Sequence, residues 1–307
     1  MAAAQVLTVF TLCVILGFAL YFLWFNFPHE TRLYDPFIAN ATQRLPATSL
    51  QFYPNLRYPD RNISYGIEAA CDEKKKKEVQ QAFAIIENLT ILNFFQAVER
   101  PQIRVYCSAL APEPKAEGHF VAGEGGPVEI INSSRYAVIL AGKISFYRSE
   151  KCARPNVALH EIFHALGFDH VNDRKNIMYP VTECSQEIGE DLIGQINEIY
   201  SVDSLPDIAI EKVMANTTGR YLNFEIVIVN NGLRDSANVT LNIASENRLL
   251  KEFELDEIAI GQRKTLYVKN LRTPGEIESV TFTAVNNDGM AELDYENNHV
   301  TLELRAG

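Results

Sequence analysis

The most informative stretch of this sequence is HEIFHALGFDH, which spans residues 160–170. Three of the six histidines in the chain lie within it. His160 and His164 are four residues apart, so on a helix their imidazoles project from one face, one turn apart. Glu161 lies beside them. Satisfied core histidines are the alternative, which the apolar neighbours would also suit, but the clustering of three histidines favours a metal site.

Gly167 and His170 complete the pattern. A glycine permits the left-handed backbone with which many helices end, so the chain can turn back at Gly167 and present His170 as a third nitrogen. Neutral imidazole nitrogen suits Zn²⁺, and three protein ligands leave the fourth position open for water, which is typical of catalytic sites. The sequence therefore predicts one catalytic Zn²⁺ held by His160, His164 and His170.

This stretch resembles the extended zinc motif of the metzincin metallopeptidases. Met178 lies eight residues after His170, within Asn-Ile-Met-Tyr-Pro, and this segment resembles the Met-turn of that family. The short spacing and the Met-Tyr-Pro triplet are most similar to matrixin-type enzymes. The resemblance covers roughly residues 58–203 and implies an α+β catalytic domain with a mixed sheet, a zinc helix, a Met-turn and a C-terminal helix.

Carried onto this sequence, the resemblance implies that Glu161 is the general base and that Met178 supports the site without binding metal. It implies that Tyr179 and Pro180 lie along the pocket for the residue after the scissile bond. The implied reaction is hydrolysis of a peptide bond by a zinc-activated water, with Glu161 passing the proton to the leaving amine. Such families pair the substrate with an edge strand, for which two segments are candidates, 127–132 and 136–147.

Some features depart from the matrixin pattern. Val171 follows the third histidine where matrixins usually have serine, and residues 28–57 contain no cysteine that could block the zinc. Latency through a cysteine switch is therefore not expected. Asp169 and Asp173 are candidate supporting or calcium ligands, but polar loop residues are the simpler interpretation, and structural Ca²⁺ has no support.

The chain begins with a candidate membrane segment. From Val6 to Phe27 no residue is charged and nearly all are apolar, whereas a membrane-spanning helix needs about 20 such residues. A cleaved signal peptide is the alternative, but its apolar part usually has about 7–15 residues. Bulky residues also stand at 21–27, where cleavage would be expected. We therefore expect residues 1–27 to be an uncleaved transmembrane signal anchor.

Cysteines and glycosylation triplets favour export of the rest of the chain. Cys13 lies in the apolar segment, and the four cysteines that follow it allow three disulfide connectivities. We expect Cys71–Cys107 and Cys152–Cys184, because the second pair brackets the histidine motif. Asn-x-Ser/Thr triplets occur at Asn40, Asn62, Asn88, Asn132, Asn216 and Asn238. The expected localisation is the cell membrane, single-pass, with the catalytic part extracytoplasmic.

A tether and two folded parts follow the anchor. Residues 28–57 have no clear hydrophobic period and are expected to be the tether. In residues 58–203, apolar spacing predicts helices over 73–92, from Pro155 to Leu166, and over 187–200. Gly-rich Glu124–Pro127 predicts a turn between strands.

After Pro206 the sequence pattern changes. Short runs of alternating apolar and polar residues follow, separated by turn residues. About seven such runs predict an all-β, Ig-like sandwich over residues 204–307. Residues 292–298 within it resemble the CARDB family of Ig-like surface domains.

The charge balance limits the partners. The net charge of −11 argues against nucleic acid, because phosphate binding requires a basic face. Lys74–Lys77 is flanked by acids and predicts a solvated helix face rather than a binding patch. The oligomeric state does not follow from the sequence.

These features together predict a membrane-anchored zinc-dependent endopeptidase, a hydrolase acting on protein or peptide substrates. One alternative is a surface adhesion or binding protein whose zinc domain is not proteolytic; the intact Glu161 argues against it. A zinc hydrolase of non-peptide bonds is the other, and the resemblance to the Met-turn argues against that.

Overall fold

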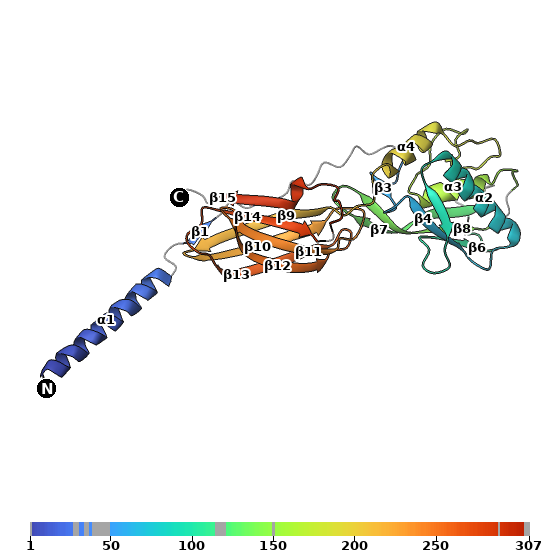
Figure 1. The fold of residues 1–307 in the computed structure, drawn as a ribbon. Coiled ribbons are helices and arrows are strands. Elements are labelled where there is room, and N and C mark those ends of the chain that lie inside the picture. Colours follow the sequence, from blue (N-terminus) through green and yellow to red (C-terminus); the bar gives the residue numbers. More distant parts are fainter. Residues whose placement is uncertain are drawn as a thin grey trace.

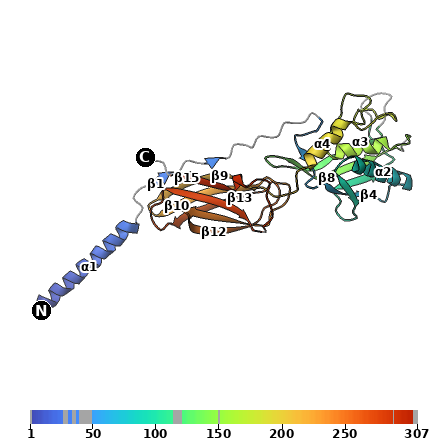
Figure 2. The same cartoon turned by 45° about the horizontal axis from the view of Figure 1, so that its top comes forward.

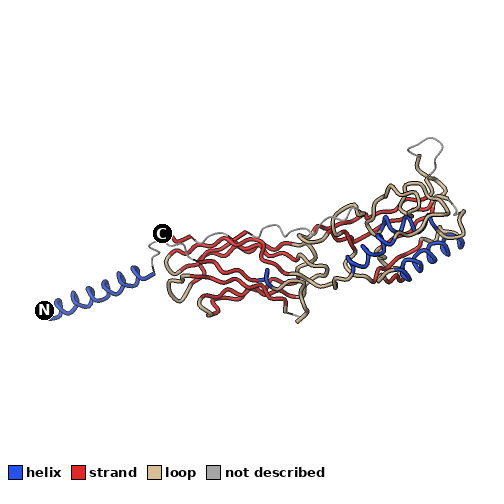
Figure 3. The backbone as a smooth tube through the Cα atoms, turned by 90° about the horizontal axis from the view of Figure 1, so that it is seen from above, coloured by secondary structure: helices blue, strands red, loops and turns tan. Residues whose placement is uncertain are grey.

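The computed structural model describes residues 2–26, 31–33, 37–38, 50–113, 121–148, 151–287 and 289–303. Beyond an N-terminal helix, the chain forms two parts with separate hydrophobic cores (Figure 1). We call residues 50–205 the mixed-sheet region and residues 206–303 the β-rich region. The two regions lie end to end, and the rotated views show the same elongated arrangement (Figure 2, Figure 3).

The mixed-sheet region contains a six-stranded sheet in the order β3-β8-β6-β4-β5, with β7 paired to β8. All neighbouring strands are parallel except β7, which runs antiparallel to β8. Among the described strands β7 pairs with β8 alone, so it forms an edge of the sheet. The strands are β3 (Leu56–Arg57), β4 (Asn62–Ile67), β5 (Asn93–Gln96), β6 (Ile103–Cys107), β7 (Gly123–Asn132) and β8 (Ala137–Phe146).

Three helices share one core with this sheet: α2 (Glu73–Leu89), α3 (Asn156–Ala165) and α4 (Glu190–Tyr200). Helix α2 begins where the Asp72 carboxylate accepts a hydrogen bond from the Lys75 N–H at 2.7 Å. Such an N-cap contributes about 1 kcal/mol. The spacing of its buried side chains is that of one helix face. They are Lys75, Val79, Ala82, Phe83 and Ile86.

The lysine run on the first turns of α2 is engaged in ion pairs. Lys75 lies 2.8 Å from Glu78, and Lys76 lies 2.8 Å from Glu73. Lys74 is also within 3.7 Å of Glu78. This pairing fits the expected helix face better than a free basic patch.

Two details of the sheet differ from the sequence expectations. Glu124–Pro127 is not a turn but lies inside β7, because the glycines there allow the strand to pack closely on α3. The four-residue strand β5 was not expected. It lies at the other end of the sheet and most of its residues are exposed, so its sequence has no apolar alternation.

Parts of the segment expected to be a tether are built into the fold. β1 (Thr31–Leu33) and β2 (Phe37–Ile38) pair with β9 (Ile208–Thr218) of the β-rich region. Arg57 in β3 is buried, and its guanidinium donates to carbonyl oxygens at the end of α4 and just beyond. Residues 28–30, 34–36 and 39–49 of this segment lie outside the described residues.

Both expected disulfides are present. Cys71–Cys107 joins the loop after β4 to the end of β6, and Cys152–Cys184 joins the loop before α3 to the loop before α4. The first asparagine of the six glycosylation triplets lies outside the described residues. Four others are exposed, namely Asn62, Asn88, Asn132 and Asn238, whereas Asn216 is half-buried.

The β-rich region consists of two antiparallel sheets that enclose the second core. One has the order β1-β9-β10-β13, with β2 also on β9; the other has the order β12-β11-β14-β15. Strand β12 was not expected, because it is an edge strand whose side chains are mostly exposed and charged. The remaining elements are β10 (Tyr221–Asn230), β11 (Asn238–Ser245), β12 (Arg248–Glu257), β13 (Arg263–Arg272), β14 (Ser279–Asn286), the 3-10 turn η1 (Glu296–Asn298) and β15 (His299–Glu303).

A third, smaller cluster joins the two regions. Tyr136, just before β8, and Val138 of β8 are buried together with Leu233 of the β-rich region. Beside this cluster, the Ser134 hydroxyl donates to the Asn231 side-chain oxygen at 2.6 Å. The hairpin between β7 and β8 therefore inserts its end into the junction. Close contact is aided by Gly261, whose backbone is left-handed and which has no side chain to overlap Ile131.

Helix α1 (Ala2–Asn26) projects from the end of the β-rich region that carries β1 (Figure 1). Its span Gln5–Leu23 is long and apolar enough to cross a membrane and contacts no core. Length and composition alone are weak evidence of an anchor, because a signal sequence near the N-terminus shares them.

Candidate metal centre

Helix α3 places two of the predicted ligands. It begins directly after Pro155, and every residue from Asn156 to Ala165 is buried. Because the helix is enclosed on all sides, the rotamers of His160 and His164 are fixed by packing. The helix ends at Ala165, and Gly167, two residues further on, has a left-handed φ of 99° and leaves no room for a side chain against Leu56.

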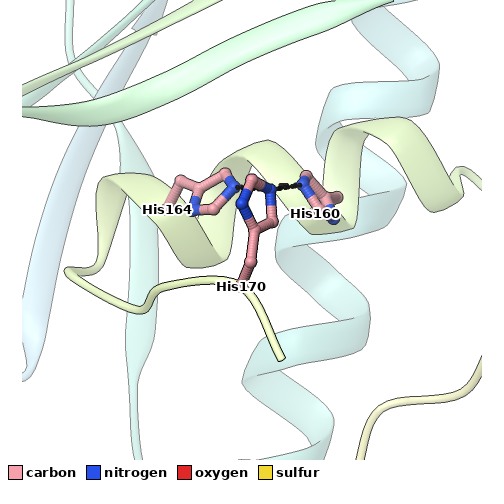
Figure 4. A group of neighbouring side chains, drawn as sticks. All are labelled: His160, His164 and His170. Atoms are coloured by element: carbon pink, nitrogen blue, oxygen red, sulfur yellow. Dashed lines mark hydrogen bonds between the residues drawn. The ribbon is translucent and has the colours of Figure 1, made fainter. Parts of the chain in front are cut away.

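The turn at Gly167 brings His170 back to the helix. The Nε2 atoms of the three histidines converge on one point, with His160 and His164 on α3 and His170 on the following loop (Figure 4). The Nε2 atoms of His160 and His164 are 3.0 Å apart. The Nε2 atom of His170 is 3.2 Å from that of His160 and 3.1 Å from that of His164.

Backbone carbonyls orient the two helical rings. The Nδ1 of His160 lies 2.6 Å from the Ile177 carbonyl oxygen, and the Nδ1 of His164 lies 2.7 Å from that of Phe168. A carbonyl only accepts, so each Nδ1 carries the proton and each Nε2 keeps a free lone pair. This arrangement fixes the tautomer that a metal ligand needs.

The three nitrogens fit a zinc ion. Lone pairs that face one another at about 3 Å repel unless a proton or cation lies between them. Zinc bonded to imidazole at about 2.0–2.1 Å in a tetrahedron has ligand atoms about 3.3–3.4 Å apart. The observed separations of 3.0–3.2 Å are slightly shorter than this. The donor set is therefore one that zinc accepts with little movement.

Burial keeps the helical imidazoles uncharged. It lowers the pKa of His160 to about 3 and that of His164 to about 4, with repulsion from the neighbouring histidines adding to the effect. Burial also lowers the pKa of His170, which the nearby Asp169 partly offsets. At neutral pH the rings are thus neutral, as metal binding requires.

Glu161 lies next to the histidines and against strand β7. Its side chain is buried, and this burial raises its pKa to about 8, with a smaller contribution from repulsion by Glu124. A side chain at Gly123 would lie 2.8 Å from the Glu161 Cγ, and one at Gly125 would overlap the Glu161 carbonyl oxygen. The two glycines therefore let the edge strand approach the site at Glu161.

The family model of the matrixins (Peptidase M10) matches residues 57–201. These residues form a metzincin-like domain. The match confirms the resemblance to the matrixins and supports a zinc metallopeptidase, which is a hydrolase. No curated protein matches the chain.

Two solved structures are similar to part of the chain. One is the CARDB domain of a Pyrococcus furiosus protein in complex with di-metal ions, at 18% identity and a TM-score of 0.26, covering 32% of this chain and 86% of that chain. The other is a domain of a Methanosarcina acetivorans protein, at 14% identity and a TM-score of 0.27, covering 33% of this chain and 91% of that chain.

The loop after the third histidine packs on the core of the metzincin-like domain. Met178 is buried, and its carbonyl accepts a hydrogen bond from the Val171 N–H at 3.0 Å. Val171 thus packs on the core at the position where matrixins usually have serine. Tyr179 is half-buried and Pro180 is exposed.

The two aspartates beside the motif make local hydrogen bonds. The Asp169 carboxylate accepts from the His170 N–H at 2.7 Å, and the Asp173 carboxylate accepts from the Lys175 N–H at 3.0 Å. Among the described residues, neither joins a cluster of ligand atoms that can hold a metal ion. Their geometry fits polar loop residues.

Sequence reasoning missed three contributors to the site. Gly125 was assigned to a turn over Glu124–Pro127 and Gly123 was given no role, although alternating glycines also mark a strand that packs closely on another backbone. Phe52 was assigned to the tether, and its ring stacks on His164 with 5.8 Å between centroids. No local pattern marks that contact, because 112 residues separate the two side chains in sequence.

The glycines of β7 give a test with an internal control. Gly125→Ala is expected to lower the free energy of unfolding by about 1–3 kcal/mol, because the new methyl group overlaps the Glu161 carbonyl oxygen. Gly126→Ala is the matched control, since open space surrounds its Cβ position. Thermal and denaturant unfolding measure both; equal stability of the two variants would contradict the close packing of β7 on α3.

Proposed function

We propose that this chain is a membrane-anchored zinc endopeptidase that hydrolyses peptide bonds in protein or peptide substrates. The supporting observation is the convergence of three imidazole nitrogens beside the buried carboxyl group of Glu161, next to an edge strand. These are the groups that hydrolysis of an extended peptide requires.

His160, His164 and His170 are the proposed ligands of one catalytic Zn²⁺. When bound, the ion acts as a Lewis acid and makes water a stronger acid. Glu161 is the proposed general base, which accepts a proton at its carboxylate and donates it to the leaving amine. In our proposal its buried position excludes bulk water from this exchange.

The substrate would add to the sheet at β7. In the described part of the chain β7 pairs with β8 on one side only, so we propose that the backbone groups on its other side bind an extended peptide. Gly123 and Gly125 bring that strand close to Glu161. Met178 is proposed to support the metal centre as a Met-turn, with Tyr179 and Pro180 along the pocket for the residue after the scissile bond.

We further propose a single-pass location at the cell membrane, with α1 as anchor and the other residues extracytoplasmic. The two disulfides support an oxidising compartment. The proposed division is anchor 1–27, tether 28–57, catalytic domain 58–203 and Ig-like β-sandwich 204–307, with residues 50–57 packed on the catalytic domain.

Metal analysis and a substrate screen test this proposal. The full chain in detergent micelles is analysed for bound metals and incubated with a mixed peptide library, followed by mass spectrometry of the products. We expect one zinc per chain and internal cleavage of peptides. Bound zinc without cleavage would favour a binding protein, and a folded chain without zinc would refute the metal centre.

A further inference from the structure

A short segment ahead of the family match forms a backbone ladder with the loop that carries the third histidine. The Phe52 N–H donates to the Gly167 carbonyl oxygen at 3.0 Å, and the Asp169 N–H donates to the Leu50 carbonyl oxygen at 2.8 Å. These bonds hold the backbone on the N-terminal side of His170. The position of that histidine depends strongly on its backbone, because it lies on a loop and is more exposed than the two helical ligands.

The same segment covers the second histidine with an aromatic ring. The rings of Phe52 and His164 are stacked, with an interplanar angle of 23° and centroids 5.8 Å apart. Such contacts lie within the range of favourable aromatic pairs. The ring thus lies against one face of the His164 imidazole, whose Nδ1 donates to the Phe168 carbonyl oxygen.

The segment is itself firmly held. The Gln51 side-chain amide donates to the Leu56 carbonyl oxygen at 2.5 Å, and its oxygen accepts from the Leu56 N–H at 3.3 Å. Leu56 is fully buried, and its side chain occupies the space beneath Gly167. This turn packs on the core through Leu56. It thus supports both the ring contact to His164 and the backbone hydrogen bonds to the loop that carries His170.

We propose that residues 50–53 act as a clamp on the metal centre and that Phe52 is a positioning residue for the zinc ligands. The ring holds His164, and the ladder holds the loop that carries His170. The inference rests on the proposed function in one respect, that the three histidines bind zinc. It extends the functional site to residues that precede the matrixin match at 57.

The rate of zinc release tests the clamp without an activity assay. Zinc-loaded full chain in detergent micelles is mixed with an excess of a chelating indicator, and absorbance is followed with time. Phe52→Ala is expected to release zinc about 10–100-fold faster than wild type, as for other residues that orient metal ligands. Phe52→Tyr, which keeps the stacked ring, is expected to restore slow release.

Tyr53→Ala is the matched control, because it removes the adjacent aromatic side chain, which is 54% exposed. It is expected to release zinc at the wild-type rate. Hydrogen exchange of the Asp169 amide is a second readout and is expected to accelerate in Phe52→Ala. Unchanged zinc release in Phe52→Ala overturns the clamp and leaves the peptidase proposal standing, whereas a wild-type chain that binds no zinc overturns both.

Discussion

Glu161→Gln is expected to lower kcat/KM for peptide cleavage by about 10²–10⁴-fold while leaving one zinc per chain. The amide has nearly the shape of the carboxylate but cannot accept the proton, and general acid–base catalysis contributes a factor of this size. The side chain is buried against β7, so an isosteric change is preferable to truncation, which would leave a cavity. Steady-state kinetics on a cleaved library peptide and elemental analysis measure the two quantities.

Glu99→Gln is a suitable control for this variant, since Glu99 is exposed and lies in the loop before β6. It is expected to retain full activity. If Glu161→Gln cleaved as fast as Glu99→Gln, Glu161 would not be the general base, and another group would have to move the proton.

His164→Ala is expected to abolish stable zinc binding and, with it, peptide cleavage. Two imidazoles remain, and the cavity left on the buried face of α3 adds a structural cost of its own. In the wild type, a chelator is expected to lower the melting temperature, because a bound ligand stabilises the folded state by about 4 kcal/mol when its free concentration is 1,000 times Kd. Differential scanning fluorimetry with and without chelator measures this shift.

Comparison with His164→Ala separates the effect of metal loss on the melting temperature from other effects of the chelator. His164→Ala has no tightly bound zinc to lose, so its melting temperature is expected to be the same with and without chelator. His299→Ala, at an exposed histidine on β15, is expected to behave as wild type. A chelator-dependent shift in His164→Ala as large as that of the wild type would place the metal elsewhere.

The sequence predicted the local part of the site well. His160, Glu161 and His164 lie on one helix, and Gly167 turns the chain to His170, so spacing alone indicates that these groups meet. The contributions of Phe52, Gly123 and the carbonyl of Ile177 depend on tertiary contacts between distant segments. Single-sequence patterns contain no information on such contacts, which explains why they were not predicted.

For the fold, too, elements with a clear local sequence pattern were predicted and those without one were not. Half-buried strands such as β10 and β14 have the alternating side chains from which about seven strands were predicted after Pro206. Edge strands β5 and β12 were missed because their mostly exposed side chains leave no alternation to detect. The Gly-rich start of β7 was misassigned because glycine signals a turn and a close backbone approach equally well.

The pairing of β1 with β9 sets how far from a membrane the enzyme would work. Strand β9 has 11 residues, with β1 on its Thr218 end, and the chain enters it at its Ile208 end from the metzincin-like domain. At about 3.3 Å per residue, the strand separates these ends by roughly 35 Å. If α1 is embedded in a bilayer, the β-rich region would separate the proposed peptidase centre from the surface, and the bonds it cleaves would lie well above the lipid headgroups.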